Sequence, residues 1–256
     1  MRKKVLLHLQ KNARRDSPGC SPMLLSIIIA CCRILAVDES SSEQSPVSVS
    51  VSQFETRAAI QRAVPSLQQG AAVSAKERKC FTCHSQAMPV IALTEAANRG
   101  FIVDQDNIQR QIQHTWDHLD KGKTDYQAGK GQGGQVMTAG YAMWTLDVAD
   151  WKSDETTNAV IHYLVEYQTD KKRWLSSSQR LPSMGSSFTA TYVSLRAMSY
   201  FGTDEQKTGI AARRDAAAKW VLETAPIDTE DRVFQLRTLP YIDASDDVKK
   251  KAVDAL

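Results

Sequence analysis

The chain has 256 residues, of which 42% are hydrophobic and 24% are charged. This length supports one large domain or two small ones, and the composition is that of a globular protein, which excludes collagen-like, fully disordered and multi-span membrane chains. The net charge of +3 comes from the N-terminus, because residues 1–36 hold seven basic groups and one acid, whereas the rest holds 25 basic and 28 acidic groups. We expect no nucleic-acid partner, since that needs clustered basic residues in the folded part.

Residues 1–36 are typical of an export signal or an N-terminal anchor. Basic residues between Arg2 and Arg15 precede an apolar stretch from Met23 to Ala36, and a Ser-rich linker follows over residues 37–54. A charged region before a hydrophobic region is the order of a signal peptide, and this stretch is shorter than the roughly 20 residues of a spanning helix. We therefore predict an exported protein, periplasmic or membrane-associated. Cleavage near Ala36, lipid attachment at Cys31 and retention as an anchor all stay open.

Two of the five cysteines lie beyond this segment, in the sequence Cys80-Phe81-Thr82-Cys83-His84. This spacing is the attachment pattern of a c-type haem. Two thiols about one helical turn apart can bond the two vinyl groups of one porphyrin, and the histidine that follows supplies the proximal iron ligand. We therefore predict one covalent haem c on Cys80 and Cys83, with His84 on the iron. Such attachment takes place outside the cytoplasm, in agreement with an export signal.

The sequence offers several candidates for the sixth iron ligand and does not choose among them. Met137 and Met143 lie 53 and 59 residues after His84, a separation similar to that of the axial methionine in small cytochromes c. His114 and His118, four residues apart on one predicted helix face, are the alternatives. They lie off the apolar stripe of that helix, so the sequence fits a solvated pair at least as well.

Two other interpretations of the cysteine pair compete with haem. A zinc site needs four ligands, and only distant His114, His118 or acidic side chains could complete one. A thioredoxin-like redox pair needs a strand before it and a helix after it, whereas both flanks of this pair have a helical pattern. Haem therefore remains the first prediction.

Periodic segments beyond the linker predict helices and almost no strands, so we expect an all-α fold. The later helices recur in pairs, with 51 residues between Tyr141 and Tyr192 and 57 between Tyr163 and Trp220. This recurrence indicates degenerate helical hairpins over residues 135–256, after a helical segment at 55–134 that carries the haem motif. The predicted helices cover about 55–70, 75–83, 88–99, 106–120, 136–149, 155–169, 188–202, 210–224, 230–243 and 246–256.

The segment from Ala159 to Trp174 resembles the QW repeat of squalene-hopene cyclases and related prenyltransferases, with Gln168 and Trp174 at the two named positions. Together with the leader and the CxxCH motif, it makes the chain similar to bacterial squalene-cyclase-like proteins that carry a cytochrome c motif. The resemblance implies an α/α toroid. Because the chain has fewer predicted helices than a closed toroid of that family and stops within a helical pattern, we expect an incomplete, partial or truncated toroid.

Enzymes of the families that the chain resembles place catalytic groups inside the toroid. A cyclase would need an acidic proton donor, and the nearest string is Asp228-Thr229-Glu230-Asp231. A helix cap explains this string more simply, because acidic residues suit the first turn of a helix. A protein prenyltransferase would need an Asp, Cys and His zinc set, but both cysteines lie outside the repeats.

The first prediction is therefore an exported c-type haem protein that passes electrons to an unidentified redox partner, and not a substrate-converting enzyme. The second is a haem-free toroid-like protein that binds a lipid or another apolar ligand. The third is a degenerate terpenoid-cyclase-like enzyme that uses Asp228 or Asp231.

Overall fold

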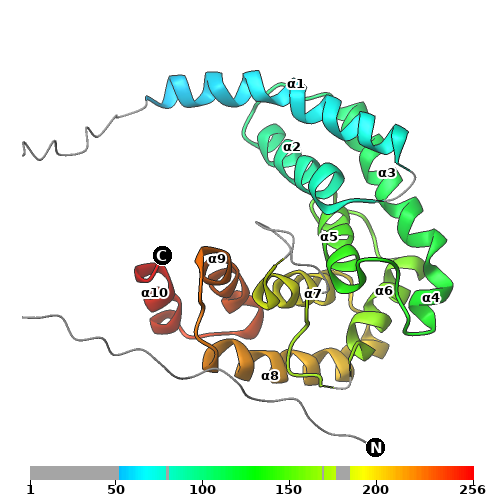
Figure 1. Cartoon of the computed structure of the whole chain (residues 1–256), viewed down its shortest axis with the longest axis vertical. Coiled ribbons are helices and arrows are strands. Elements are labelled where there is room, and N and C mark those ends of the chain that lie inside the picture. Colours follow the sequence, from blue (N-terminus) through cyan, green and yellow to red (C-terminus); the bar gives the residue numbers. More distant parts are fainter. Residues whose placement is uncertain (1–51, 79–80, 169, 177–184) are drawn as a thin grey trace, which may run out of the picture. The chain divides into compact units, whose positions relative to one another are not determined.

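The computed structural model of the chain describes residues 52–78, 81–168, 170–176 and 185–256. The predicted signal, Cys31, nearly all of the Ser-rich linker, and Cys80 lie outside these residues. Residues 51–256 form one compact unit. All regular secondary structure in the described residues is helical, which confirms the predicted all-α fold (Figure 1).

Ten α-helices and three shorter helices follow one another along the described chain. The α-helices are α1 (Gln53–Glu77), α2 (Met88–Asn98), α3 (Gln105–Lys121), α4 (Lys123–Gln127), α5 (Gln135–Asp147), α6 (Glu155–Glu166), α7 (Ser187–Phe201), α8 (Lys207–Glu223), α9 (Thr229–Thr238) and α10 (Asp246–Asp254). The shorter ones are the π-helix η1 (Cys83–Ala87) and the 3-10 helices η2 (Asp204–Gln206) and η3 (Leu239–Ile242). Short polar side chains cap many of the helix starts by accepting a backbone hydrogen bond; these residues are Ser52, Asp104, Asp154, Ser186 and Asp228.

The structure differs from the predicted helices in two boundaries and one additional helix. The predicted helices at 55–70 and 75–83 are one helix, because α1 continues through Gly70 and ends at Glu77, before the haem motif. A glycine inside a helix costs only about 1 kcal/mol, which the packing of α1 on α2 and α3 outweighs. The short helix α4 was not predicted. The predicted helix at 230–243 ends as α-helix at Thr238 and continues as η3, where Pro240 lacks the N–H that an α-helix needs.

The helices lie in two layers (Figure 1). One layer contains α1, α3, α6 and α8, and the other contains α2, α5, α7 and α9, with neighbours in each layer in contact. From α5 to α9, successive long helices alternate between the two layers, an arrangement of helical hairpins. The segment that carries the haem motif packs directly on these hairpins, because α3 and η1 both contact α5.

The helices α5 and α7 form the centre of the core. Every residue from Val136 to Leu146 in α5 is buried, and a helix buried on all sides belongs to a protein interior. Gly140 permits the close approach of α7, since a Cβ atom at this position would lie 2.3 Å from Cγ2 of Val193. Because η1 packs on α5, the described end of the predicted haem motif, from Cys83 on, contacts a helix at the centre of the core.

Trp174 joins three helices of the hairpin region. It is fully buried, its Nε1 donates to the Leu164 backbone oxygen of α6 at 2.9 Å, and its backbone N–H donates to Oγ1 of Thr191 in α7 at 3.3 Å. The guanidinium of Arg213 in α8 lies over its ring, with Cζ 3.9 Å from the ring centroid. Gln168, at the other position of the QW-like pattern, has a φ of +69° just after α6 ends. The chain therefore turns at Gln168 and returns to the core at Trp174.

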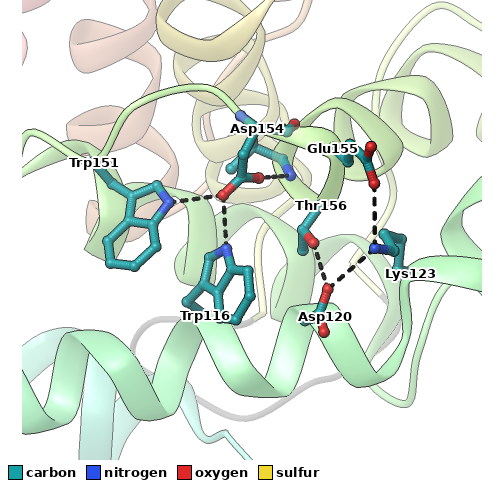
Figure 2. Close-up of polar contacts among 8 residues, drawn as sticks. Trp116, Asp120, Lys123, Trp151, Asp154, Glu155 and Thr156 are labelled. Carbon is teal, nitrogen blue, oxygen red and sulfur yellow. Dashed lines mark hydrogen bonds and ion pairs between the residues drawn. The ribbon is translucent and has the colours of Figure 1, made fainter.

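A polar cluster joins α3 to the start of α6 (Figure 2). Oδ2 of Asp154 accepts hydrogen bonds from the indole Nε1 atoms of Trp116 at 2.8 Å and Trp151 at 3.0 Å, and Oδ1 accepts from the Thr157 backbone N–H at 2.8 Å. Burial alone would raise the pKa of Asp154, but these hydrogen bonds outweigh burial and lower it. One carboxylate thus caps α6 and holds two indoles.

Candidate functional site

The described part of the haem motif lies between α1 and α2 and against α5. Phe81 and Cys83 are buried, with 5% and 3% of their surface exposed, whereas His84 is exposed. The π-helix η1 begins at Cys83 and contacts α1, α2 and α5. Single π-turns are frequent at functional sites. The two neighbouring residues thus differ in environment, with Cys83 in the core and His84 at the surface, while Cys80 lies outside the described residues.

The Cys83 side chain faces α5. Its Sγ lies 3.7 Å from the backbone oxygen of Met137, to which the thiol donates a hydrogen bond. Both predicted methionine ligands are in α5 and fully buried. Met143 lies six residues beyond Met137, about 9 Å farther along the helix at 1.5 Å per residue. Of the two methionines, Met137 is the one whose backbone meets the motif.

Gln86 holds the start of η1 in place, and the sequence analysis missed it. Its Oε1 accepts hydrogen bonds from the backbone N–H of Thr82 at 2.8 Å and from the Thr82 hydroxyl at 2.6 Å. The side chain is fully buried, and its Nε2 has no hydrogen-bond partner among the described residues. The four-residue spacing from Thr82 to Gln86 fits a helical pair, but a single sequence does not distinguish such a glutamine from an exposed one.

His118 of α3 contacts the motif directly. Its ring stacks on that of Phe81, with the centroids 6.0 Å apart and the planes inclined by 26°. The Nε2 atoms of His118 and of His114, one turn earlier, are buried and have no hydrogen-bond partner among the described residues. Both side chains are partly exposed but their Nε2 atoms are buried, so the two histidines are not a fully solvated pair. They lie off the apolar stripe of α3, but His118 faces Phe81 of the motif.

Burial lowers the pKa of His118 to about 4, and repulsion from His114 and Lys121 adds to this effect. The imidazole is therefore neutral at pH 7. A neutral imidazole keeps a lone pair on one ring nitrogen, which is the form that binds metal ions.

We expect the haem-free chain to lose stability between pH 6.5 and 4, since the pKa of His118 falls from 6.5 in the unfolded chain to about 4 in the folded one. In this window only the unfolded chain takes up the proton, so lowering the pH favours unfolding. For a half-buried ring the loss should be about 1–2 kcal/mol after solvent screening. Urea unfolding at pH 7 and pH 4.5 measures it. Because carboxylates also titrate, the comparison is made with His118→Gln, and an unchanged pH dependence in this variant would contradict the prediction.

The acidic string at 228–231 starts α9 and confirms the helix-cap interpretation. Oδ1 of Asp228 accepts from the Asp231 backbone N–H at 2.8 Å. The Asp231 carboxylate accepts from the Ser186 hydroxyl at 2.5 Å and from the Ile227 backbone N–H at 3.1 Å, so both of its oxygens are already engaged as acceptors. A pocket of about 610 Å³ adjoins them, and its other lining residues include Arg173, Phe188, Trp220 and Thr224.

Comparison with known protein families, with curated proteins and with solved structures finds no match for this chain. Of the helices that the structure describes, none combines the length and the apolar character needed to cross a membrane. Within the same residues, no three His, Cys, Asp or Glu side chains are grouped so as to hold a metal ion. A haem needs no such group, because the porphyrin itself supplies four nitrogen ligands and the protein adds the axial ones.

Proposed function

We propose that this protein is exported, carries one c-type haem on Cys80 and Cys83 with His84 as the proximal iron ligand, and passes electrons to a redox partner. The observation that carries the proposal is the CxxCH motif, whose histidine is exposed next to a buried Cys83. When bound, the haem supplies one-electron exchange at iron, and the protein tunes it through axial ligands and burial.

The residues around the motif suit a porphyrin in two ways. First, the surroundings are apolar, because Phe81, Cys83, Ala87, Val90 and Leu93 are core side chains; at most 5% of each is exposed, so a porphyrin would have to displace part of this packing. Second, Nε2 of Gln86 and Nε2 of His118, whose ring stacks on Phe81, are buried without a hydrogen-bond partner in the described part of the chain, and so is Nε2 of His114, one turn before His118 on α3. A buried polar atom without a partner costs about 1–3 kcal/mol, which an added group could recover. The imidazole of His84 is exposed and therefore open to an added ligand.

The buried position of Cys83 sets a condition on haem attachment. In each thioether bond the S–H adds across a vinyl double bond, so that sulfur bonds one carbon, hydrogen goes to the other, and no oxidant is needed. Cys83 is only 3% exposed and its thiol faces the Met137 carbonyl, which closes this sulfur to a vinyl group in the folded chain. A chain that carries the haem would therefore hold Cys83 in a different packing, with the contact between its sulfur and the Met137 carbonyl broken.

Expression of the full chain in an exporting host with haem-attachment machinery tests the proposal. We expect a Soret band that stays with the polypeptide after denaturation and acid–acetone extraction, and an intact mass increased by one haem. The double variant Cys80→Ser/Cys83→Ser should lose all covalent haem, because no thiol of the motif remains. The matched control Cys20→Ser, which lies outside the motif, should keep the haem. A colourless wild-type protein would overturn the proposal and favour haem-free ligand binding.

A further inference from the structure

The pocket at the start of α9 lies between three helices and a loop. It has a volume of about 610 Å³, within the range of about 300–1,000 Å³ that is typical of sites for small molecules. The first residues of α7, the last turn of α8 and the first residues of α9 line it, together with Arg173, which precedes Trp174. Because these parts of the chain are far apart in the sequence, no local motif reveals the pocket.

Part of the lining is apolar. The rings of Phe188 and Trp220 pack against each other, with centroids 4.6 Å apart and planes inclined by 38°. Phe188 is buried, Trp220 is partly exposed, and Ile227 is 86% exposed. Water around such aromatic and aliphatic surface is released when an apolar group covers it, which favours binding. This part of the lining therefore suits the apolar body of a ligand.

Arg173 brings a positive charge to the pocket. Its Cζ lies 5.4 Å from the centroid of the Trp220 ring, and within the described residues its guanidinium makes no ion pair. The backbone at this position is fixed by the next residue, Trp174, which is fully buried and donates its indole N–H to α6. The charge is thus held at the pocket before any ligand binds.

The two carboxylates of the pocket are already engaged. Asp231 is only 8% exposed, and its two oxygens accept from the Ser186 hydroxyl and the Ile227 backbone N–H. Oδ1 of Asp228 accepts from the Asp231 backbone N–H and caps α9. Both carboxylates lie at the N-terminus of α9, where the helix dipole offsets negative charge. Since Arg173 has no acidic partner in the described residues, the pocket favours an anion over a cation.

We infer that this pocket binds a small organic carboxylate, with the carboxylate group paired to Arg173 and the apolar body against the rings of Phe188 and Trp220. A guanidinium matches a carboxylate through two parallel hydrogen bonds, which fixes the orientation of the ligand. A neutral ligand of the same shape lacks the charged hydrogen bonds, and a cation is repelled by Arg173. The inference makes no use of the haem motif, so it goes beyond the proposed function and does not depend on it.

Isothermal titration calorimetry of the purified full chain with octanoate, octanol and octylamine tests the inference, because these probes share an alkyl chain and differ in charge. We expect octanoate to bind at least about tenfold more tightly than octanol, which corresponds to about 1.4 kcal/mol, and octylamine to bind more weakly still. Arg173→Gln should remove the preference for octanoate and leave the weak binding of octanol, a change that a loss of folding would not produce. No octanoate binding by the wild type, or equal binding of the three probes, overturns the inference.

Two more variants test the location of the site. Ile227→Asp adds a negative charge on a side chain that is 86% exposed, so folding should persist while octanoate binding weakens by at least about tenfold. The matched control Arg214→Gln removes an α8 arginine that pairs with Asp243 at 3.6 Å outside this pocket, and it should bind octanoate as the wild type does. An Arg173→Gln variant that keeps the preference for octanoate, or an Arg214→Gln variant that loses it, would place the probe elsewhere and overturn the inference.

Discussion

Trp174→Ala is expected to lower the free energy of unfolding by about 4–5 kcal/mol, at the upper end of the range for a buried tryptophan. The side chain is fully buried, so its removal leaves a large cavity between α6, α7 and α8. The Leu164 backbone oxygen also loses its indole donor, and the Arg213 guanidinium loses the ring beneath it. Urea unfolding of the full chain, followed by far-UV circular dichroism, measures the loss.

Two further variants show how much of this loss of stability comes from the Trp174 ring and how much from the Arg213 charge. Trp174→Phe keeps an aromatic face for Arg213 but lacks the N–H, so we expect a loss of about 1–2 kcal/mol. Burial lowers the pKa of Arg213 to about 10, and none of its three side-chain nitrogens has a hydrogen-bond partner among the described residues. Replacing such a charge by an apolar side chain is often neutral or stabilising, so Arg213→Met should cost little. A cost for Arg213→Met as large as that of Trp174→Ala would contradict this account.

A helix could be predicted from the sequence where its apolar residues recur at helical spacing and a capping residue marks its start. In α3 the apolar residues Ile108, Ile112 and Leu119 recur at helical spacing and are buried, and Asp104 caps the start. The continuity of α1 through Gly70 could not be predicted, because it depends on packing against α2 and α3 that a local pattern does not contain. The helix α4 is only five residues long, too short for a period to show.

In the candidate site, too, residues within a local motif could be predicted, whereas a contact between distant segments could not. The spacing of Cys80, Cys83 and His84 is required by covalent chemistry within five residues, so one sequence suffices to name them. The stacking of His118 on Phe81 joins residues 37 positions apart and arises only when α3 packs beside the motif. The sequence left His118 open between a solvated residue and a ligand, because the apolar stripe of α3 does not show that Phe81 covers a histidine beside it.

Asp154→Ala is expected to lower the free energy of unfolding by about 3 kcal/mol, since hydrogen bonds to a charged group contribute about 1.5–3 kcal/mol each when buried and less at this half-buried site. The carboxylate accepts from two indoles and from the first turn of α6 (Figure 2), so its loss leaves Trp116 and Trp151 without their acceptor and removes the helix cap. Thermal and urea unfolding of the full chain measure the loss, and the fluorescence of the two tryptophans should change with it.

Asp154→Asn separates the two functions of this carboxylate. Asparagine caps helices as well as aspartate does, so Oδ1 can still accept from the Thr157 backbone N–H. Its amide nitrogen, however, donates and cannot accept from the indoles that Oδ2 now holds at 2.8 and 3.0 Å. We therefore expect Asp154→Asn to retain the cap and to lose about 2 kcal/mol, most of the effect of Asp154→Ala. An Asp154→Asn variant as stable as the wild type would show that the cap alone, and not the link from α3 to α6 through two tryptophans, stabilises this junction.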